Sequence, residues 1–349
     1  MATEPPGAVI NLIAVIIAVT EDRPRVLIVE DNHLCDSRPA LKLDIDAPET
    51  AAYALPNGPF EPQQHAGLES GLRRLVEEQT GINLYYVEQL YTFGNRFRDP
   101  SEIDGGPRVV SVAYVALTHE ELVDSREAQW HDWYDFLPWE DWRSERPAVM
   151  TGEIEPSLAR WVRSARSQEK KKQHQERVNV TFGRGLAAEM DAVLCLERYE
   201  LLYEAGLVAE ADRDAIAANM SSDAPNALSP VARSDAMGTP LLSDHRRILA
   251  TALGRLRGKL AYRPVVFELL PGEFTLLQLQ RVVEALSGAD LHKQNFRRLV
   301  TNADLVEPIG RTSAIGRGRP AELFRFRREV LGEKLTVGLS RPVMRSGGA

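Results

Sequence analysis

Positions 75, 78 and 79 of the segment Leu72–Ile82 share one helix face, where three carboxylates would hold a metal ion together. Apolar residues recur at helical spacing at positions 68, 72, 75 and 76, and Gly81 follows as a helix stop. Three carboxylates on the helix face of positions 75, 78 and 79 could bind Mg²⁺ against a diphosphate. The residues present are Leu75, Glu78 and Gln79, so one carboxylate remains. Because Mg²⁺ keeps its water unless several charged oxygens replace it, we predict neither a metal site nor catalytic residues here.

The stretch from Leu55 to Ile82 resembles the Nudix signature, which surrounds such a carboxylate face with fixed glycine, arginine and aliphatic positions. Gly58 and Gly81 stand at glycine positions, Arg74 at the arginine and Val76 at an aliphatic position. The resemblance implies a Nudix fold that is retained for binding rather than hydrolysis. The alternative is an amphipathic helix of some other α/β domain.

A second stretch, Val87–Pro100 followed by Arg108–Tyr114, resembles the Nudix-related transcriptional regulators of NAD metabolism. In that family this strand–loop–strand flanks a pocket for ADP-ribose or a related nucleotide; Asn95 and Asn57 depart from the usual aspartate and glycine. Arginines can pair with a diphosphate, and aromatic rings can stack on adenine. The alternative places the aromatics in the core and the arginines on the surface. The candidate ligand-binding residues are Asn57, Tyr91, Phe93, Arg96, Arg98 and Arg108.

The segment Leu291–Thr301 predicts a helix with a basic outer face. Phe296, Leu299 and Val300 recur at helical spacing and should face the core. The remaining basic and amide side chains can bind phosphate oxygens and base edges, although a merely solvated face is the alternative. A basic, glycine-rich loop follows at residues 310–320, in the position of a wing. The candidate DNA-binding residues are Lys293, Gln294, Asn295, Arg297, Arg298, Thr301, Arg311, Arg317 and Arg319.

The elements around that helix follow the order of a winged helix. Ser243–Leu260 predicts a first helix, and Thr275 with Gln278 forms a capping box that starts the second. Predicted strands at 305–307 and 322–327 flank the basic loop. Several motifs resemble the winged-helix half of the same regulator family: Asp244–Leu249, Leu256–Tyr262, Phe274–Gln280, Asn295–Arg298 and Gly318–Phe326.

These elements predict three segments. Residues 8–143 form an α/β Nudix-like N-terminal domain, residues 150–242 an α-helical linker region, and residues 243–330 a C-terminal winged helix-turn-helix domain. The predicted elements of the first segment are strands at Val9–Thr20, Arg25–Glu30, Val87–Phe93 and Val109–Leu117, with a helix at Leu68–Thr80.

The linker region predicts helices at Ser157–Gln175 and Ala187–Ala205, followed by a loop at Ser221–Pro240. The run Glu169–Lys172 is interpreted as a solvated helix face, with a nucleic-acid contact as the alternative. The role of this region in the protein stays open.

Charge is distributed unevenly along the chain. The 349 residues carry a net charge of −8, yet Asp244–Arg328 contains sixteen Lys and Arg against eight Asp and Glu. An acidic body with one basic end is expected where only that end meets phosphates. Cys35 and Cys195 lack metal-ligand spacing, and the apolar stretch Ala8–Val19 is too short to cross a bilayer. We therefore expect a cytoplasmic protein without a membrane partner.

The family resemblance implies a transcriptional repressor of NAD biosynthesis or salvage genes. It implies a homodimer on palindromic operator DNA, which ADP-ribose, NAD or a related nucleotide releases, with no required cofactor and no enzymatic activity. One alternative is an active Nudix pyrophosphohydrolase on ADP-ribose-like substrates, with a magnesium site rebuilt around Glu78 from Glu69 or Glu77. Another makes the winged helix a protein-interaction module.

Overall fold

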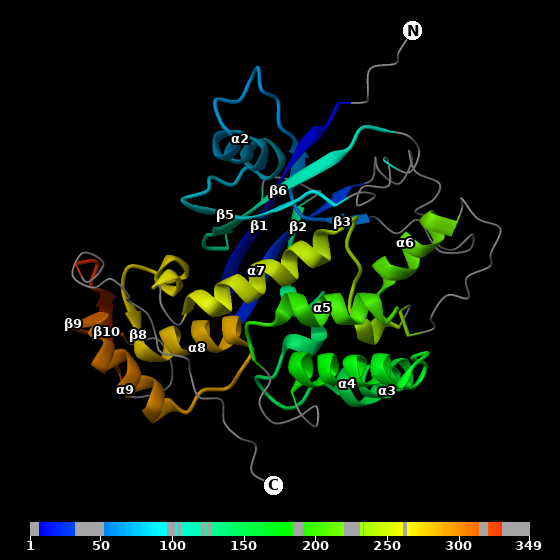
Figure 1. Cartoon of the computed structure of the whole chain (residues 1–349). Coiled ribbons are helices and arrows are strands. Elements are labelled where there is room, and N and C mark those ends of the chain that lie inside the picture. Colours follow the sequence, from blue (N-terminus) through cyan, green and yellow to red (C-terminus); the bar gives the residue numbers. More distant parts are fainter. Residues whose placement is uncertain are drawn as a thin grey trace.

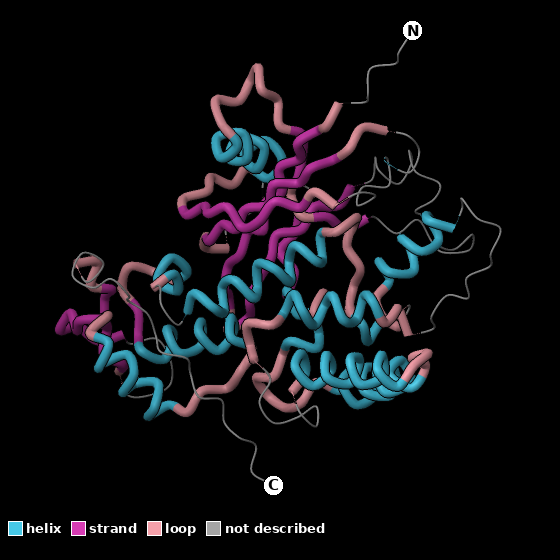
Figure 2. Tube along the Cα trace, viewed as in Figure 1, coloured by secondary structure: helices cyan, strands magenta, loops and turns pink. Residues whose placement is uncertain are grey.

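The computed structural model describes residues 7–31, 52–95, 102, 106–120, 123, 128–183, 191–219, 231–232, 234–260, 264–313 and 320–329. Figure 1 shows a large sheet at the top, helices beneath it, and a small sheet at the lower left. Figure 2 shows that helices separate the two sheets. No helix among these residues is long and apolar enough to cross a membrane.

The large sheet is mixed and has the strand order β3-β2-β1-β6-β5, with β4 paired to β1 and β7 to β2. At its centre β1 and β6 run parallel, in a register from Val9 opposite Val109 to Ile17 opposite Leu117. Glu21 and Asp22, both with positive φ, form the turn between β1 and β2. The strands are β1 (Val9–Thr20), β2 (Arg23–Asp31), β3 (Ala52–Ala54), β4 (Asn57–Pro59), β5 (Tyr86–Phe93), β6 (Val109–Leu117) and β7 (Ala128–Asp132).

Helices cover both faces of this sheet, so β1 is buried on both sides. Leu12, Ala14 and Ile16 pack in the cluster beneath α2 (Leu68–Thr80). The alternate residues, from Ile13 to Ile17, pack in a larger cluster with α7 (His245–Leu260). Because successive strand side chains point to opposite faces, one apolar strand joins the two cores.

The middle of the chain is helical and continues the larger core. The single helix predicted at Ser157–Gln175 is wrong, because the chain turns at 164–167 and the Ser167 hydroxyl caps a new helix by accepting from Lys170 N at 3.2 Å. The elements are η3 (Trp133–Asp135), η4 (Pro138–Glu140), the π-helical η5 (Met150–Ile154), α3 (Glu155–Arg163), α4 (Gln168–Phe182), α5 (Cys195–Glu204), α6 (Ala209–Asn219) and η7 (Asp235–Met237).

The second helix predicted for the linker, Ala187–Ala205, begins later than expected. Within its described part the helix starts at Cys195, and residues 187–190 lie outside the described residues, as does most of the predicted loop Ser221–Pro240.

The C-terminal elements form a winged helix, as predicted. Thr275 and Gln278 make the expected capping box, and Gly288 ends the helix that they begin. The next helix spans Lys293–Ala303, two residues later than predicted at each end. The elements are η8 (Val265–Leu269), β8 (Phe274–Thr275), α8 (Leu276–Ser287), α9 (Lys293–Ala303), β9 (Val306–Ser313) and β10 (Ala321–Phe326), with the strand order β8-β10-β9.

A buried ionic cluster, made of Glu140, Arg198 and Arg257, joins these regions. Glu140 Oε1 accepts from Arg198 Nε at 2.5 Å, and its Oε2 accepts from Arg257 Nη1 at 2.5 Å. The three side chains are 0–2% exposed and come from η4, α5 and α7. Burial would raise the pKa of Glu140, but the charges and hydrogen bonds of the two arginines outweigh it and lower that pKa. The sequence did not predict this cluster.

Cys195 lies against the same cluster and stays a neutral thiol. Its Sγ donates to Glu140 Oε2 at 3.4 Å, and burial raises its pKa to about 12. A thiol with so high a pKa is a poor nucleophile at neutral pH.

Arg257 of the ionic cluster, together with Tyr134 and Trp142, holds the end of α8. Arg257 Nε donates to Leu286 O at 3.1 Å, and Tyr134 Oη donates to Ala285 O at 2.8 Å. Trp142 N donates to Gly288 O at 2.8 Å. Carbonyl groups at the end of α8, which lack partners within the helix, are thus satisfied by groups from η3, α7 and the segment after η4.

Replacing Gly288 with alanine is expected to lower the free energy of unfolding by more than about 2 kcal/mol. Gly288 has a φ of +71°, and a Cβ would lie 2.4 Å from both Glu140 O and Arg257 Nη2. Gly310 is a matched control, since its φ is +69° but nothing lies within 4 Å of its Cβ position. Urea unfolding should therefore show a clearly larger loss for Gly288→Ala than for Gly310→Ala; equal losses would contradict the steric argument.

Candidate functional site

The basic face of α9 is open to solvent. Phe296 and Val300 are 3% and 0% exposed and hold the helix against the core, as the spacing predicted. Lys293, Arg297 and Arg298 form no ion pair with any carboxylate of the described residues. All six predicted α9 residues are exposed: Lys293, Gln294, Asn295, Arg297, Arg298 and Thr301. The helix therefore presents unneutralised cations and amides that can bind phosphates and base edges.

The turn before α9 is fixed by two side chains of α8 that the sequence analysis missed. Gln280 Nε2 donates to Leu291 O at 3.1 Å, and Glu284 Oε1 accepts from Leu291 N at 3.0 Å. The amide also donates to Glu284 Oε1 at 2.9 Å, so the two side chains support each other. The signal in the sequence was the four-residue spacing of Gln280 and Glu284. This spacing does not reveal that Gln280 contacts Leu291, eleven residues away.

The wing is described only in part. Arg311 lies exposed on β9 and forms an ion pair with Glu273, which precedes β8. A phosphate would have to compete with this carboxylate for Arg311. Arg317 and Arg319, the other two predicted wing residues, lie outside the described residues.

The helix face that would carry magnesium ligands is occupied by other contacts. Leu75 is 8% exposed and packs on Gly58, where an added Cβ would lie 2.4 Å from Leu75 Cδ1. Glu78 Oε1 accepts from Arg74 Nε at 2.7 Å, and Gln79 Nε2 donates to Asn57 O at 2.8 Å. Across the described part of the chain, no three His, Cys, Asp or Glu side chains are grouped to hold a metal ion.

The predicted nucleotide-binding residues occupy different surroundings. Tyr91 is 59% exposed, whereas Phe93 is 7% exposed and belongs to the core on the α7 side of the sheet. Their ring centroids are 5.1 Å apart, edge to face. Arg108 Nη2 donates to Gly94 O at 2.6 Å, just beyond the end of β5. The structure therefore places Tyr91, Phe93 and Arg108 at one end of the β5–β6 pair.

Among the described residues, no contact joins Asn57 to that end of the β5–β6 pair. Asn57 lies on β4, where its Nδ2 donates to Leu55 O at 2.8 Å and its carbonyl accepts from Gln79 of α2. Arg96 and Arg98 lie outside the described residues.

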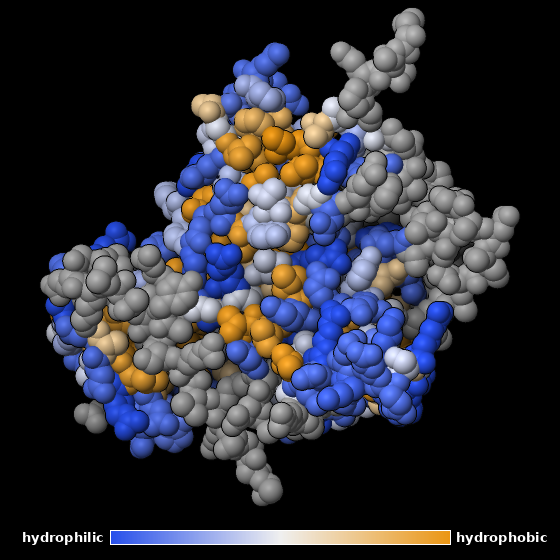
Figure 3. Space-filling model, in the orientation of Figure 1, coloured by the Kyte–Doolittle hydropathy of each residue, from blue (hydrophilic) through white to orange (hydrophobic). Residues whose placement is uncertain are grey.

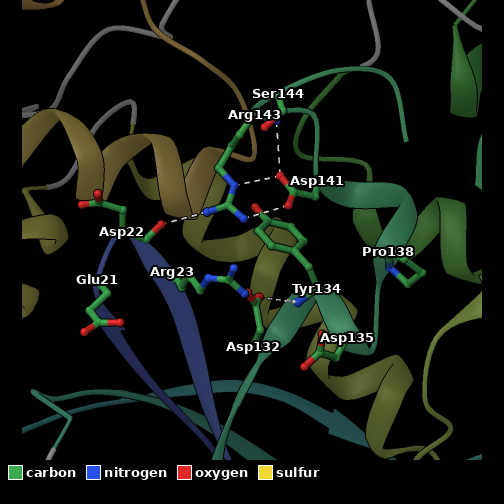
Figure 4. A pocket seen from close by; sticks show the side chains of 10 residues that line it. All are labelled: Glu21, Asp22, Arg23, Asp132, Tyr134, Asp135, Pro138, Asp141, Arg143 and Ser144. Atoms are coloured by element: carbon green, nitrogen blue, oxygen red, sulfur yellow. Dashed lines mark hydrogen bonds and ion pairs between the residues drawn. The ribbon is translucent and has the colours of Figure 1, made fainter. Parts of the chain in front are cut away.

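A separate surface hollow of about 490 Å³ lies at the tip of the β1–β2 hairpin. Figure 4 shows Arg143 at its centre, donating to Asp141 at 2.8 and 2.7 Å and to Asp22 O at 2.8 Å. Asp22 also forms an ion pair of 2.9 Å with Arg281 of α8. None of the sequence-predicted ligand residues that the structure describes lines this hollow, and its two arginines, Arg23 and Arg143, are already paired with aspartates. The Asp22–Arg281 ion pair at its edge joins the β1–β2 hairpin to α8.

Comparisons with known proteins agree with this architecture. Residues 266–326 match the family described as the NrtR DNA-binding winged helix domain. A relative described as the ADPR responsive transcriptional repressor NtrR, from Acinetobacter baylyi, is 36% identical over 91 residues, or 26% of this chain. That match spans 36% of the relative's length.

Solved structures extend the likeness to nearly the whole chain. Shewanella oneidensis NrtR in complex with a 27mer DNA is 20% identical, with a TM-score of 0.51 over 91% of this chain and 93% of that one. NrtR from the same organism without DNA gives 19% identity and a TM-score of 0.50 over 96% and 98%. The predicted fold, a Nudix-like domain followed by a winged helix of the NrtR type, is confirmed.

Proposed function

We propose that this chain is a transcriptional repressor whose α9 binds operator DNA and whose Nudix-like domain senses a nucleotide. The observation that carries the proposal is the exposed basic face of α9, without ion pairs to any described carboxylate, within a winged helix of the NrtR type. In a winged helix this is the position of the helix that enters the major groove. The relative's description as an ADPR responsive repressor and the DNA complex of Shewanella NrtR support the same function.

The effector of the proposed sensor is ADP-ribose, NAD or a related nucleotide. Tyr91 offers an exposed ring for stacking on adenine, and Arg108 offers a guanidinium group at the same end of β5 for a diphosphate. Phe93 supports Tyr91 from the core rather than meeting ligand itself. Asn57, Arg96 and Arg98 complete the proposed ligand-binding set.

The target genes are those of NAD biosynthesis or salvage, and the protein acts in the cytoplasm as a homodimer on a palindromic site. Two copies of α9 would then lie about one helical turn apart, ~34 Å, on one side of the duplex. The nucleotide releases DNA if it binds the DNA-incompetent arrangement more tightly. The ionic cluster and the Asp22–Arg281 ion pair offer a physical route, since both connect the Nudix-like domain to α8.

The proposed sensor binds without hydrolysis and requires no cofactor. Leu75 and Gln79 supply no charged oxygen, and Glu78 is engaged by Arg74. Incubation with ADP-ribose and Mg²⁺ is therefore expected to release no AMP above background. Rapid AMP release would favour the alternative, a Nudix pyrophosphohydrolase.

Footprinting on the DNA upstream of its own gene tests the proposal directly. The expected result is one protected palindromic site, bound with higher affinity than a shuffled duplex of the same composition. Adding ADP-ribose should lower the affinity for the palindrome. If the protein binds both duplexes equally, the winged helix is not an operator reader, and the protein-interaction alternative gains support.

A further inference from the structure

A second group of cations without an ion-pair partner among the described residues lies on the hairpin formed by α3 and α4. Most described arginines form an ion pair with a carboxylate, as Arg177 of α4 does with Glu204. Among the described residues, the cations without such a pair gather mainly on α9 and on this hairpin. The hairpin set is Arg160, Arg163, Arg166, Lys170, Lys171 and Lys172, all of them exposed.

The hairpin is a rigid support for these side chains. The rings of Trp161 on α3 and His174 on α4 are stacked, with centroids 3.7 Å apart and planes 5° from parallel. Val162, Val178 and Phe182 are buried between the hairpin and the main core. The six cations are therefore carried by a packed helix pair rather than by a loose tail. We call this set the hairpin basic surface.

Helix stability alone does not favour lysines at these positions. Lys170, Lys171 and Lys172 follow directly after the start of α4 at Gln168. Cations near a helix N-terminus are opposed by the positive end of the helix dipole. The segment 157–177 carries seven Lys and Arg against two Glu, in a chain whose net charge is −8. This local excess of positive charge favours an anionic partner.

We propose that the hairpin basic surface binds the phosphates of duplex DNA that flanks the operator. This inference rests on the proposed function, because α9 must first bring the duplex to the protein. In Figure 1 α9 and the α3–α4 hairpin lie at opposite ends of the lower edge of the molecule. A duplex that leaves α9 along this edge meets the hairpin, where contacts to phosphates add affinity but no sequence information.

The surface chemistry favours nucleic acid over a membrane. An interfacial helix needs a broad apolar face beside its cations. Val180 is the one large hydrophobic side chain of the described hairpin that is markedly exposed, at 67%. Figure 3 shows the region over α3 and α4, at the lower right, as almost uniformly hydrophilic.

The test compares two duplexes in fluorescence anisotropy titrations of the full chain. One carries only the footprinted operator, and the other extends it by about two helical turns, ~20 base pairs, on each side. The wild-type protein should bind the extended duplex more tightly. The triple variant Lys170→Gln, Lys171→Gln, Lys172→Gln should lose about tenfold on the extended duplex alone. Its salt dependence, the slope of log K against log salt, should fall by about one to two, because consecutive residues of a helix do not share one face.

A matched pair of single variants distinguishes the loss of a phosphate contact from the loss of net charge. Lys171→Gln and Arg177→Gln remove the same charge from the same helix, but Arg177 is already paired with Glu204. Lys171→Gln should lower the salt slope by about one, and Arg177→Gln should leave it unchanged.

Three outcomes would overturn the inference while leaving the proposed function intact. In the first, the wild type binds both duplexes equally. In the second, the triple variant weakens both equally. In the third, the lysines govern binding to phosphatidylserine vesicles but not to the flanking DNA. If the wild type recognises neither duplex over a shuffled one, the proposed function itself fails.

Discussion

Replacing Glu140 with alanine is expected to lower the free energy of unfolding by about 3–5 kcal/mol, because two buried guanidinium groups would lose their shared carboxylate. Arg198 and Arg257 are 0% and 2% exposed, so water cannot take the place of the missing charge. The loss of stability should affect all three regions together, since the three side chains come from η4, α5 and α7.

Urea denaturation followed by circular dichroism and tryptophan fluorescence measures this loss. Glu78→Ala is the matched control, because Glu78 pairs with Arg74 on the surface, where both side chains are more than half exposed. Exposed pairs contribute little, so the control should unfold close to the wild type. A Glu140→Ala protein as stable as the control would show that the ionic cluster does not stabilise the fold.

The same carboxylate predicts an acid sensitivity. The pKa of Glu140 is lowered in the folded protein, so its contribution to stability is present above the unfolded pKa near 4.5 and is lost as pH falls through the folded value. Glu140→Gln removes this titration. The stability difference between wild type and Glu140→Gln should therefore shrink as pH falls below about 4.5; a difference that stays constant would contradict the ion-pair interpretation.

Replacing Arg297 and Arg298 together with alanine is expected to weaken operator binding by about 100-fold or more. Both side chains are exposed on α9 and have no ion-pair partner among the described residues. Each can contact a base edge or a phosphate, and a base-edge contact contributes about 1–3 kcal/mol. Discrimination between the operator and a shuffled duplex should fall as well, which a purely electrostatic role would not produce.

Arg325→Ala is the control for this experiment. Arg325 lies in the same winged helix and is exposed, but it is paired with Glu307 of β9. Anisotropy titrations should show near wild-type operator affinity for this control, and thermal melts should show that both proteins are folded. An Arg297, Arg298 double variant that binds like the control would exclude α9 as the operator reader.

Local patterns alone determined most of the elements of this protein. The helix Leu68–Thr80 and the strand Val109–Leu117 were predicted with their observed bounds, because burial on one face of a helix or a strand leaves a period that is visible in the sequence. The capping box at Thr275 is equally local, since donor and acceptor lie three residues apart. The break at Ser167 had an equally local signal, a serine that caps the helix three residues ahead of Lys170. The helical pattern on both sides of it obscured this signal.

The tertiary structure decided which charges are neutralised and which remain available. Glu140 meets arginines 58 and 117 residues away, and nothing in the sequence distinguishes it from other glutamates. Likewise Arg177 and Arg311 are paired, whereas Lys171 and Arg297 have no ion-pair partner among the described residues, although all four are basic side chains. Sequence fixes a side chain's charge, but the electrostatic energy depends on separations that only packing sets.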